Sequence, residues 1–189
     1  MFLLVFILNT FYSHAHDFEN FFPKGSFGNK KVVEDLVQNW YGKHLASMEE
    51  PILFRKASGK VYRFTWLRSF DSPMVFRISK NRKNSFKLVV KKTDGHGGYE
   101  AGEIIFNKDI QLTNSQSGPL LGKIEKECEF WKMPSQINED GHDGAQWILE
   151  GIKEGKYHMV DRQSPVKGCM YEIGKMFMDL SGVQIDNVY

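Results

Sequence analysis

From Val61 to Leu112 the sequence alternates with a period of two residues, and this pattern constrains the fold more than any other feature. Apolar or aromatic residues recur at every second position in three runs, 62–67, 75–78 and 86–91. Turn-forming residues at 71–73 and 81–84 separate these runs. Such runs predict consecutive antiparallel strands, and 103–106 continues the pattern as a fourth strand. We therefore expect an antiparallel β-meander in the middle of the chain.

A β-hairpin is predicted further along the chain. Segments 146–150 and 156–162 have strand character and flank the turn formers Glu154-Gly155. A two-residue loop at this point pairs Trp147 with Arg162 across the hairpin. The guanidinium of Arg162 could then lie over the indole of Trp147.

Helical periodicity surrounds the predicted strands. Apolar residues recur at helical spacing from Lys31 to Met48, and Pro51 ends that pattern. Thr113 can cap a second helix that ends near Cys128, and a third helix is expected from Cys169 to Leu180.

Together these patterns predict a single α+β domain over residues 31–182. It combines the antiparallel meander and the C-terminal hairpin with about three helices packed mainly on one face of the sheet. Its 189-residue length suits one domain. An extended arm at 16–30 precedes the domain, and a short tail at 183–189 follows it.

The first fifteen residues resemble a cleaved signal peptide, although a buried strand is the alternative. Phe2 to Leu8 is an uninterrupted apolar run, and Ser13-His14-Ala15 supplies small residues at a cleavage site. The run is too short to span a bilayer, so no transmembrane segment is expected after cleavage. We therefore expect a periplasmic or secreted protein.

The chain has two cysteines, Cys128 and Cys169. In an oxidising compartment they can form one disulfide, and two buried free thiols are the equal alternative.

Charge and motifs exclude several classes of function. Lysine plus arginine number 25 against 23 acidic residues, and the two signs are mixed along the chain, which disfavours nucleic-acid binding. No nucleophile elbow, phosphate-binding loop or dinucleotide fingerprint occurs. Whether the protein is an enzyme is therefore uncertain, and a non-enzymatic role is favoured. We expect no cofactor.

Two similar loops, 94–98 and 140–144, each contain an Asp-Gly-His sequence. Carboxylate and imidazole groups on such loops could bind a divalent metal through His96, His142 and Asp143. Ordinary turns are the alternative, because Asp-Gly and Gly-Gly are common turn dipeptides.

Several aromatic and polar residues are candidates for binding a partner: Tyr99, Glu100, Trp131, Trp147, His158 and Arg162. Trp131 follows Phe130 and could be an exposed anchor, although such a pair more often closes a core. Glu150 and His158 would fall on opposite faces of the hairpin, so they are disfavoured as an acid–base pair.

Four motifs also resemble a group of exported bacterial proteins of unknown function. They are Gly97–Gly102, Phe130-Trp131 with Pro134, Asp143–Gly151, and Gly155–His158 followed by Val160, Arg162 and Pro165. The similarity covers about residues 60–182. It implies an α+β domain of the bacterial envelope or secreted space, and it implies no activity.

The leading hypothesis is a non-enzymatic module that binds a protein or an envelope component, for example as an immunity or inhibitor protein. A metal-dependent hydrolase that uses the two Asp-Gly-His loops is the first alternative. A structural envelope protein is the second.

Overall fold

The computed structural model describes residues 20–28, 30–56, 58–81, 85–137, 144–185 and 188–189. The predicted signal peptide, residues 1–15, lies outside the described residues. Within these ranges no helix is both long enough and apolar enough to cross a membrane.

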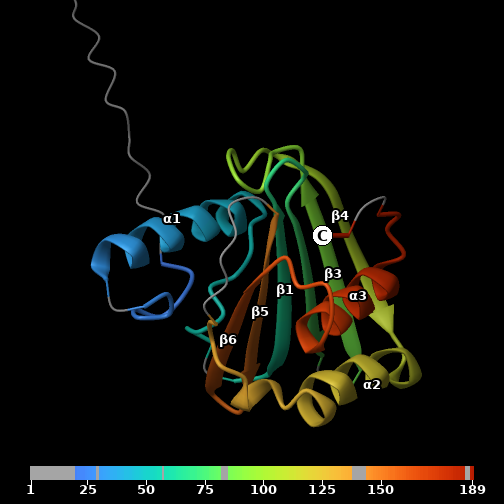
Figure 1. Ribbon diagram of the computed structural model, residues 1–189. Helices are drawn as coiled ribbons and strands as arrows, with labels where there is room; N and C mark the ends of the chain where they lie inside the picture. Colours follow the sequence, from blue (N-terminus) through green and yellow to red (C-terminus); the bar gives the residue numbers. More distant parts are fainter. Residues whose placement is uncertain (1–19, 29, 57, 82–84, 138–143, 186–187) are drawn as a thin grey trace, which may run out of the picture.

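Six strands form one antiparallel sheet, as the alternating pattern predicts (Figure 1). The strands are β1 Lys60–Arg68, β2 Met74–Lys80, β3 Phe86–Thr93, β4 Ile104–Leu112, β5 Ala145–Lys153 and β6 Lys156–Gln163. Their order across the sheet is β4-β3-β2-β1-β5-β6. The meander therefore contributes four strands, and the hairpin adds two beside β1.

The predicted hairpin register is confirmed, since Trp147 pairs with Arg162 and Gly151 with His158. Glu154 and Gly155 both have positive φ, at 52° and 75°, which is the geometry of a two-residue hairpin turn. The strand expected at 103–106 is longer than predicted and runs to Leu112. Polar residues in the centre of this strand mask the alternation in the sequence. Pairing with β3 continues along the strand as far as Leu112.

Three α-helices pack on the sheet: α1 Lys31–Ser47, α2 Asn114–Gly122 and α3 Cys169–Ser181. Thr113 caps α2 as predicted, in a capping box with Gln116. A π-helical turn, Lys123–Glu127, continues α2 to Cys128, and a short 3-10 helix, Phe130–Lys132, follows.

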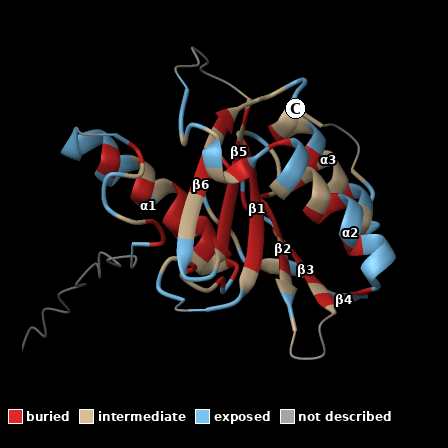
Figure 2. Cartoon of the chain, turned by 90° about the horizontal axis from the view of Figure 1, so that it is seen from below, coloured by how far each residue is buried: buried red, intermediate tan, exposed pale blue. Residues whose placement is uncertain are grey.

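Both faces of the sheet are covered. Helices α2 and α3 lie on one face, over a large apolar cluster that includes Phe64, Phe76 and Phe177. Helix α1 and the arm around Phe22 cover the other face with a smaller cluster. Two of the three helices thus share one face, and α1 lies opposite. Burial on both sides explains why β1 and β5 are buried over most of their length (Figure 2).

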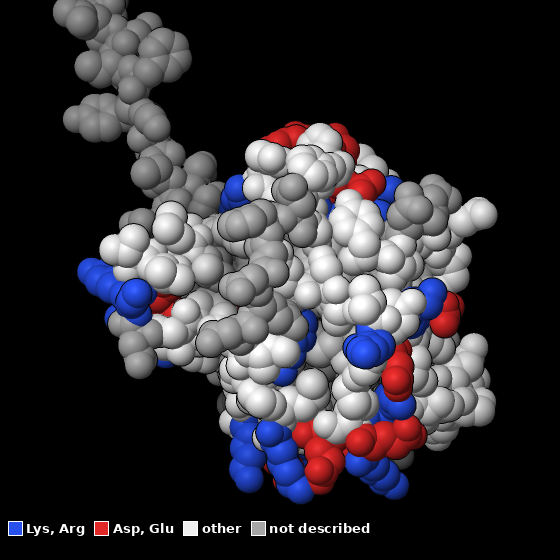
Figure 3. Space-filling model, viewed as in Figure 1, with Lys and Arg blue, Asp and Glu red and all other residues white. Residues whose placement is uncertain are grey.

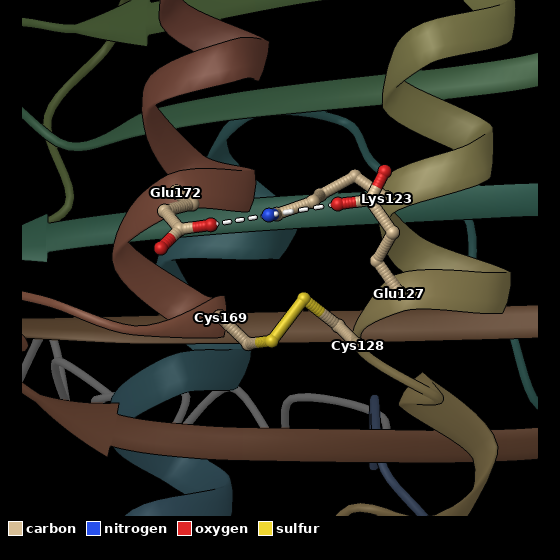
Figure 4. Close-up of a disulfide and its surroundings, with 5 residues drawn as sticks. All are labelled: Lys123, Glu127, Cys128, Cys169 and Glu172. Carbon is tan, nitrogen blue, oxygen red and sulfur yellow. Dashed lines mark hydrogen bonds and ion pairs between the residues drawn. A yellow bond between two sulfur atoms is a disulfide. The ribbon is translucent and has the colours of Figure 1, made fainter.

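A disulfide joins Cys128 to Cys169, which decides between the two alternatives that the sequence left open. It links the end of the π-helical turn to the start of α3, with Cα atoms 5.7 Å apart (Figure 4). Lys123 links the same two elements through its ion pair with Glu172, and it also pairs with Glu127 within the π-helical turn. These links hold the segment that carries Trp131 against the sheet.

Candidate functional site

A hollow of about 560 Å³ lies where the β5–β6 hairpin turns. Its lining residues come from the hairpin and the 3-10 helix: Trp131, Lys153, Glu154, Lys156, Tyr157 and His158. Figure 3 shows basic and acidic side chains close together at this end of the molecule. We call this feature the hairpin hollow.

Trp131 forms an aromatic wall of the hairpin hollow. Its ring contacts Phe130, with centroids 5.2 Å apart, and Tyr62, at 6.2 Å. Phe130 is fully buried and fixes the segment on β5 at Gly151. A Cβ atom at Gly151 would lie 2.6 Å from the Phe130 ring, so only glycine fits there. Trp131 itself is partly buried, so it packs on the core and also keeps some surface exposed.

His158 lies beside this wall, on the α3 face of the sheet. Its ring meets Phe130 edge-on at 5.0 Å, and its Nε2 is 3.0 Å from the Met133 carbonyl oxygen. Burial lowers the pKa of His158, and the charge of Arg162 adds to this effect against the Met133 hydrogen bond. The ring is therefore neutral at pH 7. Donation from Nε2 leaves Nδ1 as an acceptor.

Two lysines supply positive charge to the hairpin hollow. Lys153 forms a 3.0 Å ion pair with Glu125, which Lys60 and the Tyr62 hydroxyl also contact. Burial alone would raise the pKa of Glu125, but these three partners lower it, so the carboxylate stays charged. Lys156 forms no ion pair with any residue in the described part of the chain. Its charge is available to a ligand.

Tyr157 connects the hairpin hollow to a buried ion pair on the α1 face. Its hydroxyl donates to Glu150 across 3.0 Å, and the guanidinium of Arg63 lies 2.6 Å from the same carboxylate. Glu150 and Arg63 are both fully buried. Burial raises the pKa of Glu150, and Arg63 opposes that shift.

Glu150 is therefore a buried partner of Arg63 and not a surface residue of the hairpin. It is also separated from His158, because Glu150 pairs with Met159 and points to the opposite face. The disfavoured acid–base pair is absent here. Sequence reasoning did not identify Arg63 as part of a site. The signal that could have indicated its burial is its place inside an apolar and aromatic strand, β1.

The candidates Tyr99 and Glu100 lie at the other end of the sheet, on the loop between β3 and β4 (Figure 1). Tyr99 is 56% exposed and contacts the exposed ring of Phe70 at 6.0 Å. Glu100 contacts His96, and this hydrogen bond lowers the pKa of Glu100. These residues do not join Trp131 and His158 in one site.

Trp147 is fully buried under α3, so it presents no surface to a partner. It belongs to the core, because the face it shares with Phe64 is the one that α3 covers. The contact of Arg162 with this indole stays a prediction. Arg162 donates to the carbonyl oxygens of Pro134 and Ser135 and ties that segment to β6.

The proposed metal ligands are only partly described, since His142 and Asp143 lie outside the described residues. The described ends of the two Asp-Gly-His loops do meet at Ser69. Gly98 donates to the Ser69 carbonyl oxygen, and Ser69 donates to that of Gly144. Among the described residues no three histidine, cysteine or acidic side chains gather as metal ligands. Metal binding by these loops stays a prediction.

No protein-family model matches this sequence, and no curated protein is significantly similar to it.

Proposed function

We propose that this protein is a non-enzymatic binding module that acts outside the cytoplasm of a bacterium. It contacts a protein partner through the hairpin hollow. An immunity or inhibitor protein is one concrete form of this role. The observation that carries the proposal is the composition of that hollow, in which an aromatic wall stands beside a lysine that no described residue pairs.

This composition indicates the chemistry of the partner. Trp131 and the neutral His158 offer flat apolar surface, and Lys156 offers charge. An acidic side chain next to an aromatic or aliphatic one would satisfy both. Tryptophan in a partly desolvated position is typical of residues that dominate binding energy.

The disulfide and the apolar start of the chain support a location outside the cytoplasm. Disulfides persist in the periplasm and in secreted proteins, and they are rare in the cytosol.

Site-specific crosslinking in an expressing bacterium tests the proposal. Lys132 is exposed beside Trp131, so a photo-crosslinking amino acid at this position should capture the partner protein. The same group at Lys108, an exposed position on the opposite edge strand β4, should capture nothing. In a chain that also carries Lys156→Glu, the adduct at position 132 should decrease about tenfold or more, because the charge of the hollow is reversed.

Lys108→Glu makes the same charge change away from the hollow and should leave the adduct unchanged. An adduct that contains glycan or lipid and no protein would contradict a protein partner. Equal capture from positions 132 and 108 would contradict the hollow as the contact site.

A further inference from the structure

Two fully buried tryptophans donate to a single oxygen atom. Trp66 on β1 and Trp147 on β5 are paired residues whose rings lie 5.8 Å apart. The Nε1 atoms of both indoles donate to the main-chain oxygen of Tyr189, each across 3.0 Å. Neither tryptophan has any exposed surface. Two convergent donors on rigid strands form a preorganised site for an oxygen acceptor.

The side chain of Tyr189 is recognised as well. Its hydroxyl donates to the carboxylate of Asp71, in the connection between β1 and β2. Burial, with further contributions from Asp71, raises the pKa of Tyr189 to about 12, so the phenol keeps its proton and remains a donor. The main-chain oxygen of Tyr189 is thus bound by the two indoles, and its hydroxyl is bound by the Asp71 carboxylate.

Arg68 organises this arrangement. Its guanidinium lies 4.2 Å from the centre of the Trp66 ring, and its Nη1 is 3.7 Å from Asp71. The cation therefore covers one indole and orients the carboxylate that accepts the phenol. Positive charge at this position also favours an electron-rich oxygen close to the two indoles.

The segment that supplies Tyr189 is held differently from the rest of the domain. Helix α3 ends at Gly182, which has a φ of 64°, and the described residues after it form no helix or strand. Val183, Ile185 and Val188 are only partly buried against the core. In the described part of this segment, every hydrogen bond to a residue beyond α3 is made by Tyr189.

We infer that Trp66, Trp147, Arg68 and Asp71 form a peptide-binding site for an extended segment that carries a tyrosine. The chain's own Tyr189 occupies this site, and it belongs to an exchangeable ligand segment. Without that segment, two buried N–H donors would lose their acceptor, which is unfavourable enough to make the emptied site receptive.

The test uses the full chain with a protease recognition sequence inserted after Gly182, cut once the protein has folded. The probe is the synthetic peptide Val-Gln-Ile-Asp-Asn-Val-Tyr, with the sequence of residues 183–189. After the cut and removal of the released segment, the peptide should bind saturably. The uncut chain should bind it far more weakly, because its own tethered segment competes for the site.

Indole resonances in ¹⁵N-labelled protein report the site directly, because the chain has four tryptophans. The N–H signals of Trp66 and Trp147 should move on cutting and return on peptide addition. Those of Trp40, which donates to Gly97, and of Trp131 should stay in place. A peptide that ends in Ala should bind about tenfold more weakly, as expected for the loss of one hydrogen-bonded ring.

Asp71→Asn should weaken peptide binding several-fold and leave the fold intact, because Asp71 is 45% exposed. Asp109→Asn, an exposed aspartate on β4, is the matched control and should have no effect. The inference is overturned if the cut, folded chain does not bind the peptide, or if the uncut chain binds it equally well. It is also overturned if the Ala-ended peptide binds as tightly as the original.

Discussion

Both faces of the sheet are covered, but by different chemistry. Under α2 and α3 the core is aromatic, and Phe64 packs between Phe76 and Phe177 with ring centroids 5.7 and 5.9 Å away. Under α1 the sheet carries charge. Arg63 and Glu150 form a pair with no exposed surface.

The charges on the α1 face bind the end of that helix and the segment that follows it. Lys91 donates to the carbonyl oxygen of Met48, the C-cap residue of α1, across 2.6 Å, and Arg63 donates to that of Pro51, beyond the helix, across 2.8 Å. Carbonyl groups at a helix end lack partners within the helix, and cations satisfy them well. Glu50 balances this positive charge, because its carboxylate lies 3.4 Å from Lys91 and 3.6 Å from Arg63; it also pairs with Arg77 at 2.7 Å. One face is therefore held by packing, whereas the other combines a smaller apolar cluster with directional contacts near a helix terminus.

Removal of one buried charge should have the largest effect on the free energy of unfolding. Arg63→Met leaves Glu150 buried without its cation, and the free energy of unfolding should fall by about 3–5 kcal/mol. Phe76→Leu, on the neighbouring strand but the other face, should cost only about 1 kcal/mol. Urea denaturation monitored by circular dichroism measures both values. Adding Glu150→Leu to Arg63→Met should recover most of the loss, since no unpaired charge remains. Equal costs for the two single variants would show that the ion pair is not critical.

Opening the disulfide should affect the opposite face. The double variant Cys128→Ser, Cys169→Ser releases a link between residues 41 positions apart and should lower the free energy of unfolding by about 2–4 kcal/mol. Hydrogen exchange should quicken in α3 and around Trp131, while amides of α1 keep their protection. A reductant should have the same effect on the natural chain and none on the variant. Uniform loss of protection over both faces would contradict this division.

Acid should act on the α1 face through His44. This histidine is fully buried, and burial, with the charge of Lys43, lowers its pKa to about 4 against smaller opposing effects of Gly97 and Glu100. The unfolded chain binds a proton near pH 6.5, whereas the folded chain stays neutral there. The stabilisation is therefore complete above pH 6.5 and is lost as the pH falls towards 4.

Between pH 7 and pH 5 this linkage amounts to about 2 kcal/mol. Urea denaturation at the two pH values should show that loss in the natural chain and a smaller one in His44→Gln. Parallel pH profiles for the two proteins would contradict the role of His44.

Local pattern was sufficient for much of the fold. The alternation from Val61 onwards predicted the meander, and Glu154-Gly155 predicted the hairpin turn with its register. Of the binding candidates, Trp131 and His158 do meet at one hollow. Trp147 could not be told from a surface residue, because its burial depends on where α3 packs.

The sequence by itself thus determined most of the elements and turns, and the side of a strand on which a residue lies, but not the full length of β4. These properties follow from the spacing of apolar, polar and turn-forming residues two to four positions apart, and this spacing is visible in a short stretch of sequence. Only the tertiary structure decided that β5 lies beside β1 and brings Trp66 next to Trp147, and Arg63 next to Glu150. It alone placed Tyr189 on the two indoles. Such contacts join residues far apart in the chain, and they depend on strand order and helix packing, which no local spacing encodes.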